Sequence, residues 1–99
     1  MHIIKAIMEI IETDSYHYTY TGYFLNGIEL KQFMKENKKV GSFIVECNIE
    51  MINIQDLYKE DIEYSYLIEL LARALLPNYN KTLKISQLEI ELKKQGFEV

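Results

Sequence analysis

The sequence predicts an α+β fold, with a small three-stranded, mostly antiparallel sheet and helices packed on one face. Two observations carry this prediction. Three segments show the strand pattern, in which apolar and polar residues alternate or apolar residues follow one another. Between and after these segments, apolar residues recur at helical spacing. The strand segments are 3–12, 16–25 and 42–54, and the helix segments are 29–37, 62–76 and 87–95. The predicted order is β-β-α-β-α-α. A chain of 99 residues, 48% of them hydrophobic, predicts a single domain over 1–99.

The first two strands are predicted to form a hairpin. Residues 3–12 are mostly apolar at both alternating sets of positions, which is typical of a central strand. A turn is predicted at 13–15, because Asp and Ser bond readily to nearby backbone. Gly22 is predicted to form a β-bulge in the second strand.

The third strand has the clearest alternation. One face is predicted to point toward the helices and carries Phe43, Val45, Cys47, Ile49 and Met51, while the other carries Glu46, Asn48 and Glu50. Cys47 is therefore predicted to be a buried thiol. A helix that crosses the sheet makes the second and third strands parallel to each other, and the first strand then fits between them, in the order 2-1-3.

The ends of the helices carry recognisable residues. Asn26 and Gly27 predict a turn before the first helix. Asp61 is predicted to cap the start of the second helix, and Pro77 to end it.

The last helix, 87–95, is specified at both ends. Ser86 and Glu89 have the spacing of a capping box, which predicts the start. Gly96 followed by Phe97 predicts a Schellman ending, in which a left-handed residue terminates the helix.

The residues that usually carry catalysis or bind metals are sparse. His2, His17 and the single cysteine have no ligand spacing, and no glycine-rich phosphate loop is present. We therefore expect no enzyme activity, no cofactor and no metal. Charged residues interrupt the apolar N-terminus, and no stretch approaches about 18 uncharged apolar residues, so we expect a cytoplasmic protein that does not enter membranes.

Acidic residues dominate the middle of a chain whose net charge is −4. Residues 40–69 contain seven acids and only one basic residue, Lys59. The candidate protein-binding acids are Glu46, Glu50, Asp56, Glu60, Asp61 and Glu63. Such a surface serves solubility alone or docks on a basic partner protein, and it repels the phosphates of nucleic acid.

Three tyrosines, Tyr16, Tyr18 and Tyr20, share one face of the second strand and complete the candidate binding residues. Three interpretations remain open for them. They pack under the helices or across strands, they form a protein-binding or self-association patch, or they stack on nucleic-acid bases.

The leading functional hypothesis is a small acidic protein-binding module that acts by steric blocking. The richness in Ile, Lys, Asn and Tyr is typical of AT-rich coding sequence, which favours a phage or plasmid origin and an inhibitor of a host factor, anti-CRISPR-like or otherwise anti-defence. The alternatives are a nucleic-acid-associated accessory protein that uses the tyrosine strand, and a toxin-neutralising immunity protein. The expected partner is another protein with a basic surface, and a homodimer is a further option.

Overall fold

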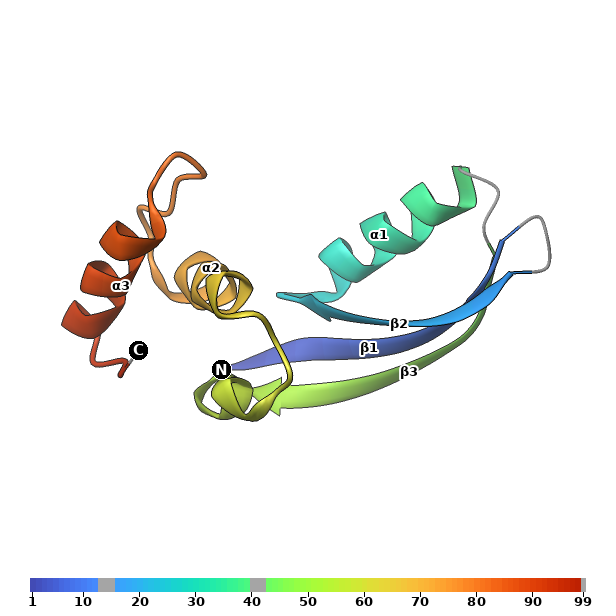
Figure 1. The fold of residues 1–99 in the computed structure, drawn as a ribbon, viewed down its shortest axis with the longest axis horizontal. Coiled ribbons are helices and arrows are strands. Elements are labelled where there is room, and N and C mark those ends of the chain that lie inside the picture. The colour runs from blue at the N-terminus through green and yellow to red at the C-terminus, as the bar shows by residue number, and fades with distance from the viewer. Residues whose placement is uncertain (13–15, 40–42, 99) are drawn as a thin grey trace. The chain divides into compact units, whose positions relative to one another are not determined.

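The computed structural model describes residues 1–12, 16–39 and 43–98 (Figure 1). The chain divides into two compact units, an N-terminal unit Met1–Asn53 and a C-terminal unit Ile54–Val99. The expectation of a single domain over 1–99 stays a prediction. The turn predicted at 13–15 lies outside the described residues.

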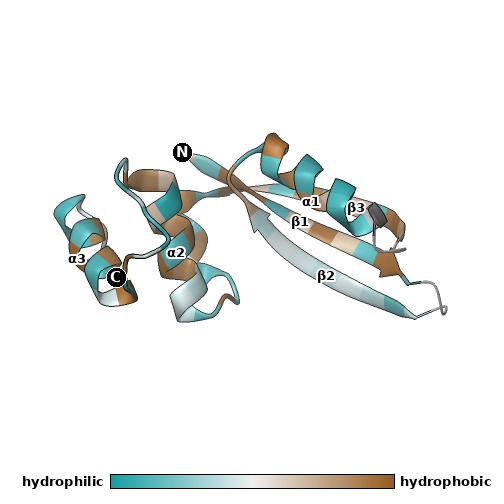
Figure 2. Cartoon of the chain, turned by 90° about the horizontal axis from the view of Figure 1, so that it is seen from above, coloured by the Kyte–Doolittle hydropathy of each residue, from teal (hydrophilic) through white to brown (hydrophobic). Residues whose placement is uncertain are grey.

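The N-terminal unit is a three-stranded sheet with one helix. Its elements are β1 (His2–Ile11), β2 (His17–Phe24), α1 (Gly27–Lys39) and β3 (Phe43–Asn53). The strand order is β2-β1-β3, and β1 is antiparallel to both neighbours. The α+β class and the 2-1-3 order are thereby confirmed. In Figure 2 the central strand β1 is largely hydrophobic, whereas the edge strand β2 is nearly neutral. This difference agrees with the order, because a strand with apolar residues on both faces favours the centre of a sheet.

The core of this unit lies between α1 and one face of the sheet. Ala6, Met8 and Ile10 project from β1 into it and are almost completely buried, and Leu30 of α1 is buried against them. The helix starts earlier than predicted because Asn26 is its cap: the side-chain Oδ1 accepts a hydrogen bond from the backbone N–H of Glu29 at 3.0 Å. The predicted turn pair thus supplies the N-cap, Asn26, and the first residue, Gly27, of the helix.

Gly22 is not a bulge. It pairs directly with Ala6, and the β1–β2 ladder continues without a shift in register. A Cβ at this position would lie 2.8 Å from ring atoms of both Tyr20 and Phe24. Phe33 of α1 stacks on the Tyr20 ring with centroids 5.0 Å apart and tilts against the Phe24 ring at 5.4 Å. A glycine is required here because aromatic rings occupy the space of a side chain.

The bulge lies in β3 instead. Two consecutive residues of β1 face Glu46 and Ile44, which leaves Val45 as an extra residue in its strand. This insertion reverses the alternation of side chains, because residues on either side of it are displaced by one position. Phe43 therefore lies on the face opposite to Cys47, and the prediction that both point toward the helices was wrong.

The predicted helix-covered face of β3 is mostly exposed. Phe43, Val45, Ile49 and Met51 are each more than half exposed, and Cys47 is half-buried rather than buried. The reason is the position of α1, which follows the end of β2 and precedes the start of β3. The helix therefore leaves the second half of β3 uncovered, although the side chains of Ile49 and Met51 project on the helix side of the sheet.

The C-terminal unit consists of the 3-10 helix η1 (Ile54–Lys59), α2 (Tyr64–Leu75) and α3 (Ile85–Lys94). The two α-helices pack against each other. The buried side chains of α2 include Ile68 and Leu71, and those of α3 are Leu88 and Leu92. Their spacings of three and four residues are those of one helix face.

The N-terminus of α2 differs from the prediction. Its cap position is Glu63, which makes no side-chain capping hydrogen bond to the helix backbone. Glu63 instead accepts a hydrogen bond from the Ser65 hydroxyl at 2.9 Å. Asp61 lies two positions too early to serve as the cap, so the predicted role was wrong.

The predicted start of α3 is also wrong, by two residues. The cap position is Lys84, and its backbone N–H donates to Oε1 of Gln87 at 3.0 Å. Gln87 thereby satisfies a backbone donor that the helix leaves open. Ser86 already lies inside the first turn, so it and Glu89 do not form the capping box that their spacing suggests.

The Schellman ending of α3 is confirmed. The backbone N–H of Phe97 donates to the carbonyl of Leu92, and that of Gly96 donates to the carbonyl of Lys93, each at 3.0 Å. Gly96 has φ of +90°, in the left-handed region. The pair of hydrogen bonds is the one that defines this motif, and the positive φ explains why glycine occupies the position.

Gly96→Val is expected to lower the free energy of unfolding by about 1–3 kcal/mol. No atom lies within 4 Å of a Cβ built at this position, so the cost comes from backbone conformation alone. Lys94→Ala is the control, because its ion pair with Glu91 at 3.2 Å is exposed and should contribute less than about 1 kcal/mol. Urea unfolding followed by circular dichroism measures both. Equal midpoints would contradict a strained left-handed position.

Candidate functional site

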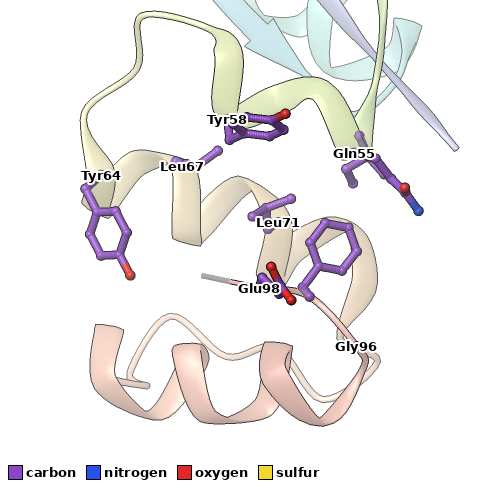
Figure 3. A pocket seen from close by; sticks show the side chains of 9 residues that line it. Gln55, Tyr58, Tyr64, Leu67, Leu71, Gly96 and Glu98 are labelled. Atoms are coloured by element: carbon purple, nitrogen blue, oxygen red, sulfur yellow. The ribbon is translucent and has the colours of Figure 1, made fainter.

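The C-terminal unit carries a concave groove. Its volume is about 730 Å³. The residues that line it are Ile54, Gln55, Tyr58, Tyr64, Leu67, Leu71, Gly96, Phe97 and Glu98. Figure 3 shows Leu67 and Leu71 between Tyr58 on one side and Glu98 on the other. The groove thus combines an apolar floor with aromatic walls and one carboxylate.

Each wall is positioned by the fold of its own segment. In η1, Ile54 and Leu57 are buried at a spacing of three residues, which leaves Tyr58 68% exposed. In α2, Tyr64 and Leu67 are three residues apart and therefore share a side of the helix. The left-handed residue after α3 reverses the chain direction, so that the segment following it reaches the groove.

Tyr64 is held by a carboxylate of α3. Partial burial of its hydroxyl, followed by a hydrogen bond to Glu89 and the negative charge of that residue, raises the pKa of Tyr64. The protonated hydroxyl acts as the donor of the hydrogen bond to Glu89. This bond orients the ring as a wall of the groove.

Four of the six predicted binding acids lie in the C-terminal unit, one within η1 and three in the segment between η1 and α2. They are Asp56, Glu60, Asp61 and Glu63. Asp56 is partly neutralised by Lys59, whose Nζ lies 3.4 Å from its Oδ1. Asp61 and Glu63 are exposed. These acids flank Tyr58 and Tyr64 in the chain, so the structure brings them to the neighbourhood of the groove although none of them lines it.

Glu46 and Glu50 belong to the N-terminal unit. They lie on the face of the sheet opposite to α1, where Glu50 faces Lys5 across the strands and Glu46 faces Glu9. Asn48, on the same face, donates a hydrogen bond to Glu46 at 3.3 Å. The six predicted acids are therefore divided between the two units.

Of the three predicted tyrosines, Tyr18 and Tyr20 lie on the helix side of β2, and Tyr16 directly precedes the strand. Tyr20 stacks on Phe33, and Tyr18 packs against the core. Partial burial and the negative charge and hydrogen bond of Glu12 raise the pKa of Tyr18. Tyr16 is 62% exposed and contacts the Tyr18 ring at 5.7 Å. Packing on the helix side therefore covers Tyr18 and Tyr20 in part, and both Tyr20, at 37% exposed, and Tyr16 remain at the surface.

The sequence pattern did not predict that aromatic and acidic side chains would form the walls of a groove. Tyr64 was assigned to the apolar stripe of α2, and Phe97 only to the helix ending. Tyr58 and Glu98 carried no assignment. A weak signal existed, because Tyr58 is a large aromatic residue within a strongly charged segment. The convergence of residues about 40 positions apart could not be inferred from spacing.

Within the described residues, no group of three or more His, Cys, Asp or Glu side chains is placed to bind a metal ion. None of the described helices has the length and apolar character needed to cross a membrane. Comparison with protein-family models, with curated proteins and with solved structures gave no match for this chain.

Proposed function

We propose that the protein is a protein-binding module whose groove in the C-terminal unit takes a basic, amphipathic segment of another protein. The observation that carries this proposal is the composition of the groove. Apolar side chains form its floor, exposed tyrosines form its walls, and the carboxylate of Glu98 lies among them. This combination suits a side chain that is apolar along its length and cationic at its end.

A lysine or arginine side chain has these properties. Its methylene groups would lie on Leu67 and Leu71, because long cationic side chains bury their stems on apolar surfaces. Its charged group would pair with Glu98 and lie near the ring of Tyr58, where the Nζ of Lys59 is already 5.8 Å from the ring centroid. A cation over a tyrosine ring contributes about 0.5–2 kcal/mol, depending on how far it is desolvated.

The acids next to the groove would act mainly on the rate of association. Residues 54–63 contain Asp56, Glu60, Asp61 and Glu63 against Lys59 alone. Their field attracts a positively charged partner and repels acidic ones and nucleic acid. Binding of the partner's basic segment in the groove would sterically prevent that segment from contacting other molecules. The narrower hypothesis of an anti-defence inhibitor encoded by a phage or plasmid stays a prediction.

A peptide selection tests this function without a known partner. A random peptide library is displayed and selected on the immobilised full-length protein. We expect the selected peptides to alternate Lys or Arg with apolar residues. Tyr58→Ala and Glu98→Gln should each weaken the best synthetic peptide about tenfold in calorimetry, which corresponds to about 1.4 kcal/mol.

Glu36→Gln is the matched control for the charge change. Glu36 is exposed on α1, outside the groove, and accepts a hydrogen bond from Gln32 of the same helix at 3.1 Å. Its variant should bind the peptide like the wild type. Selection of uncharged or acidic peptides, or binding that neither groove variant weakens, would refute the proposal.

A further inference from the structure

The outer edge of β3 is long and its helix-side face is apolar, and within the described residues no strand covers it. The order β2-β1-β3 gives β3 a partner on one side only. Exposed edge strands are usually protected by charged side chains, especially lysine, by proline or by a bulge. Residues 46–53 contain no Lys, Arg or Pro, and their two charged residues, Glu46 and Glu50, lie on the face opposite to α1. The bulge at Val45 protects only one end.

The side chains of this edge are also exposed. Ile49 and Met51 project on the helix side of the sheet, where α1 does not cover them, and they are 57% and 58% exposed. Cys47 lies next to them on the same face and is half-buried. A row of apolar side chains along an open edge is typical of a surface that pairs with another strand.

We infer that β3 pairs with β3 of a second copy of the chain, in an antiparallel arrangement centred on Ile49. The two three-stranded sheets would then form one continuous sheet of six strands around a two-fold axis. This surface belongs to the N-terminal unit, and the inference does not depend on the groove.

The charges on β3 exclude two neighbouring registers and are compatible with a centre at Ile49. In a two-fold antiparallel pair, residues of equal distance from the centre face each other. A centre at Asn48 would place Glu46 opposite Glu50 of the second copy, and a centre at Glu50 would place both copies of Glu50 together. Like charges directly opposite are destabilising. A centre at Ile49 instead places Glu50 opposite Asn48 and Glu46 opposite Ile52, so no charges of the same sign meet.

The apolar side chains agree with the same centre. Ile49 then faces Ile49 of the second copy, and Cys47 faces Met51 on either side of it. These side chains form one apolar row on the helix side. A centre at Asn48 would pair Ile49 with Cys47, but it would place Met51 opposite the bulged Val45. A centre at Cys47 would pair the bulged Val45 with Ile49, and a bulged residue disrupts the ladder. A second copy therefore fits both the charge pattern and the apolar pattern of this edge.

Disulfide trapping tests the register. In the double variant Cys47→Ser, Ile49→Cys, the two introduced cysteines would face each other. Their Cα atoms would be about 4.5–5.5 Å apart, within the range of a disulfide. Mild oxidation should convert this variant into a covalent dimer. Wild-type Cys47 should not cross-link, because its counterpart would lie about 13 Å away along the strand.

The double variant Cys47→Ser, Asn48→Cys is the matched control, since its cysteines would also be out of register. Faster cross-linking through residue 47 or 48 than through 49 would overturn the proposed pairing.

Sedimentation of the uncross-linked protein gives a second, independent test. The wild type should show a concentration-dependent monomer–dimer equilibrium. Ile49→Lys should raise its dissociation constant at least about tenfold, because it places two like charges together at the axis. Phe43→Lys, a change of similar kind outside the paired residues, should have little effect. A wild-type protein that stays monomeric up to millimolar concentration would refute the inference.

Discussion

Met8→Ala is expected to lower the free energy of unfolding by about 2–5 kcal/mol. Met8 projects from the central strand into the core beneath α1 and has 0% of its surface exposed. Its neighbours on the two flanking strands are Tyr20 and Cys47. Truncation removes buried apolar surface and leaves a cavity that a close-packed sheet and helix cannot fill. Urea unfolding followed by circular dichroism measures the loss.

Met51→Ala is the matched control for this substitution. Met51 is on the same side of the sheet, in the neighbouring strand, but is 58% exposed. Because water already contacts much of its side chain, the same truncation should cost less than about 1 kcal/mol. The comparison is made at low protein concentration, since Met51 lies on the proposed self-association edge. Equal losses for the two methionines would contradict the described core.

Gly22→Ala is expected to lower the free energy of unfolding by about 1–3 kcal/mol, the usual cost of overpacking. The added methyl group would lie 2.8 Å from ring atoms of both Tyr20 and Phe24. Those rings cannot withdraw freely, because both contact Phe33 of α1. The substitution should therefore disturb the contact between the helix and the sheet as well as β2 itself.

Gly27→Ala is the control, with the same chemical change in open space. No atom lies within 4 Å of a Cβ at Gly27, and its φ is not in the left-handed region. Alanine there should be neutral or should stabilise the protein by about 0.4–1 kcal/mol, because it reduces the entropy of the unfolded chain. A Gly22→Ala variant as stable as Gly27→Ala would show that the rings do not enclose the glycine.

The two proposals on binding can succeed or fail independently. The peptide-binding groove is tested by variants at residues 58 and 98 of the C-terminal unit. Self-association is tested at residue 49 of the N-terminal unit. A protein that dimerises but selects no basic peptides would retain the second proposal and lose the first, and the opposite result would do the reverse.

Local features of the sequence were sufficient for much of the fold. Two-sided apolar character placed β1 at the centre of the sheet, because only a strand covered by neighbours and by a helix uses apolar residues at both alternating sets of positions. The Schellman ending followed from Gly96, since a left-handed backbone conformation strongly favours glycine. Both inferences depend on residues that are close to one another along the chain or that belong to one strand.

The errors arose where several local solutions were available. Ser86 and Glu89 have the spacing of a capping box, yet the cap position is Lys84, two residues before Ser86, and the Gln87 side chain accepts a hydrogen bond from its backbone N–H. Gly22 resembles a bulge residue, but it is a glycine because of rings that pack over it. Alternation along β3 predicted one covered face, and a single extra residue at Val45 changed which side chains share it.

Composition and periodicity alone thus determined the α+β class, the strand order, the acidic character of residues 40–69 and the ending of α3. Only the tertiary structure decided that α1 leaves Ile49 and Met51 uncovered, and that Tyr58, Leu67 and Glu98 line one groove. The physical reason is the range of the interactions. Turns, caps and alternation depend on neighbours along the chain, whereas coverage of a strand and convergence on a groove depend on where distant segments pack.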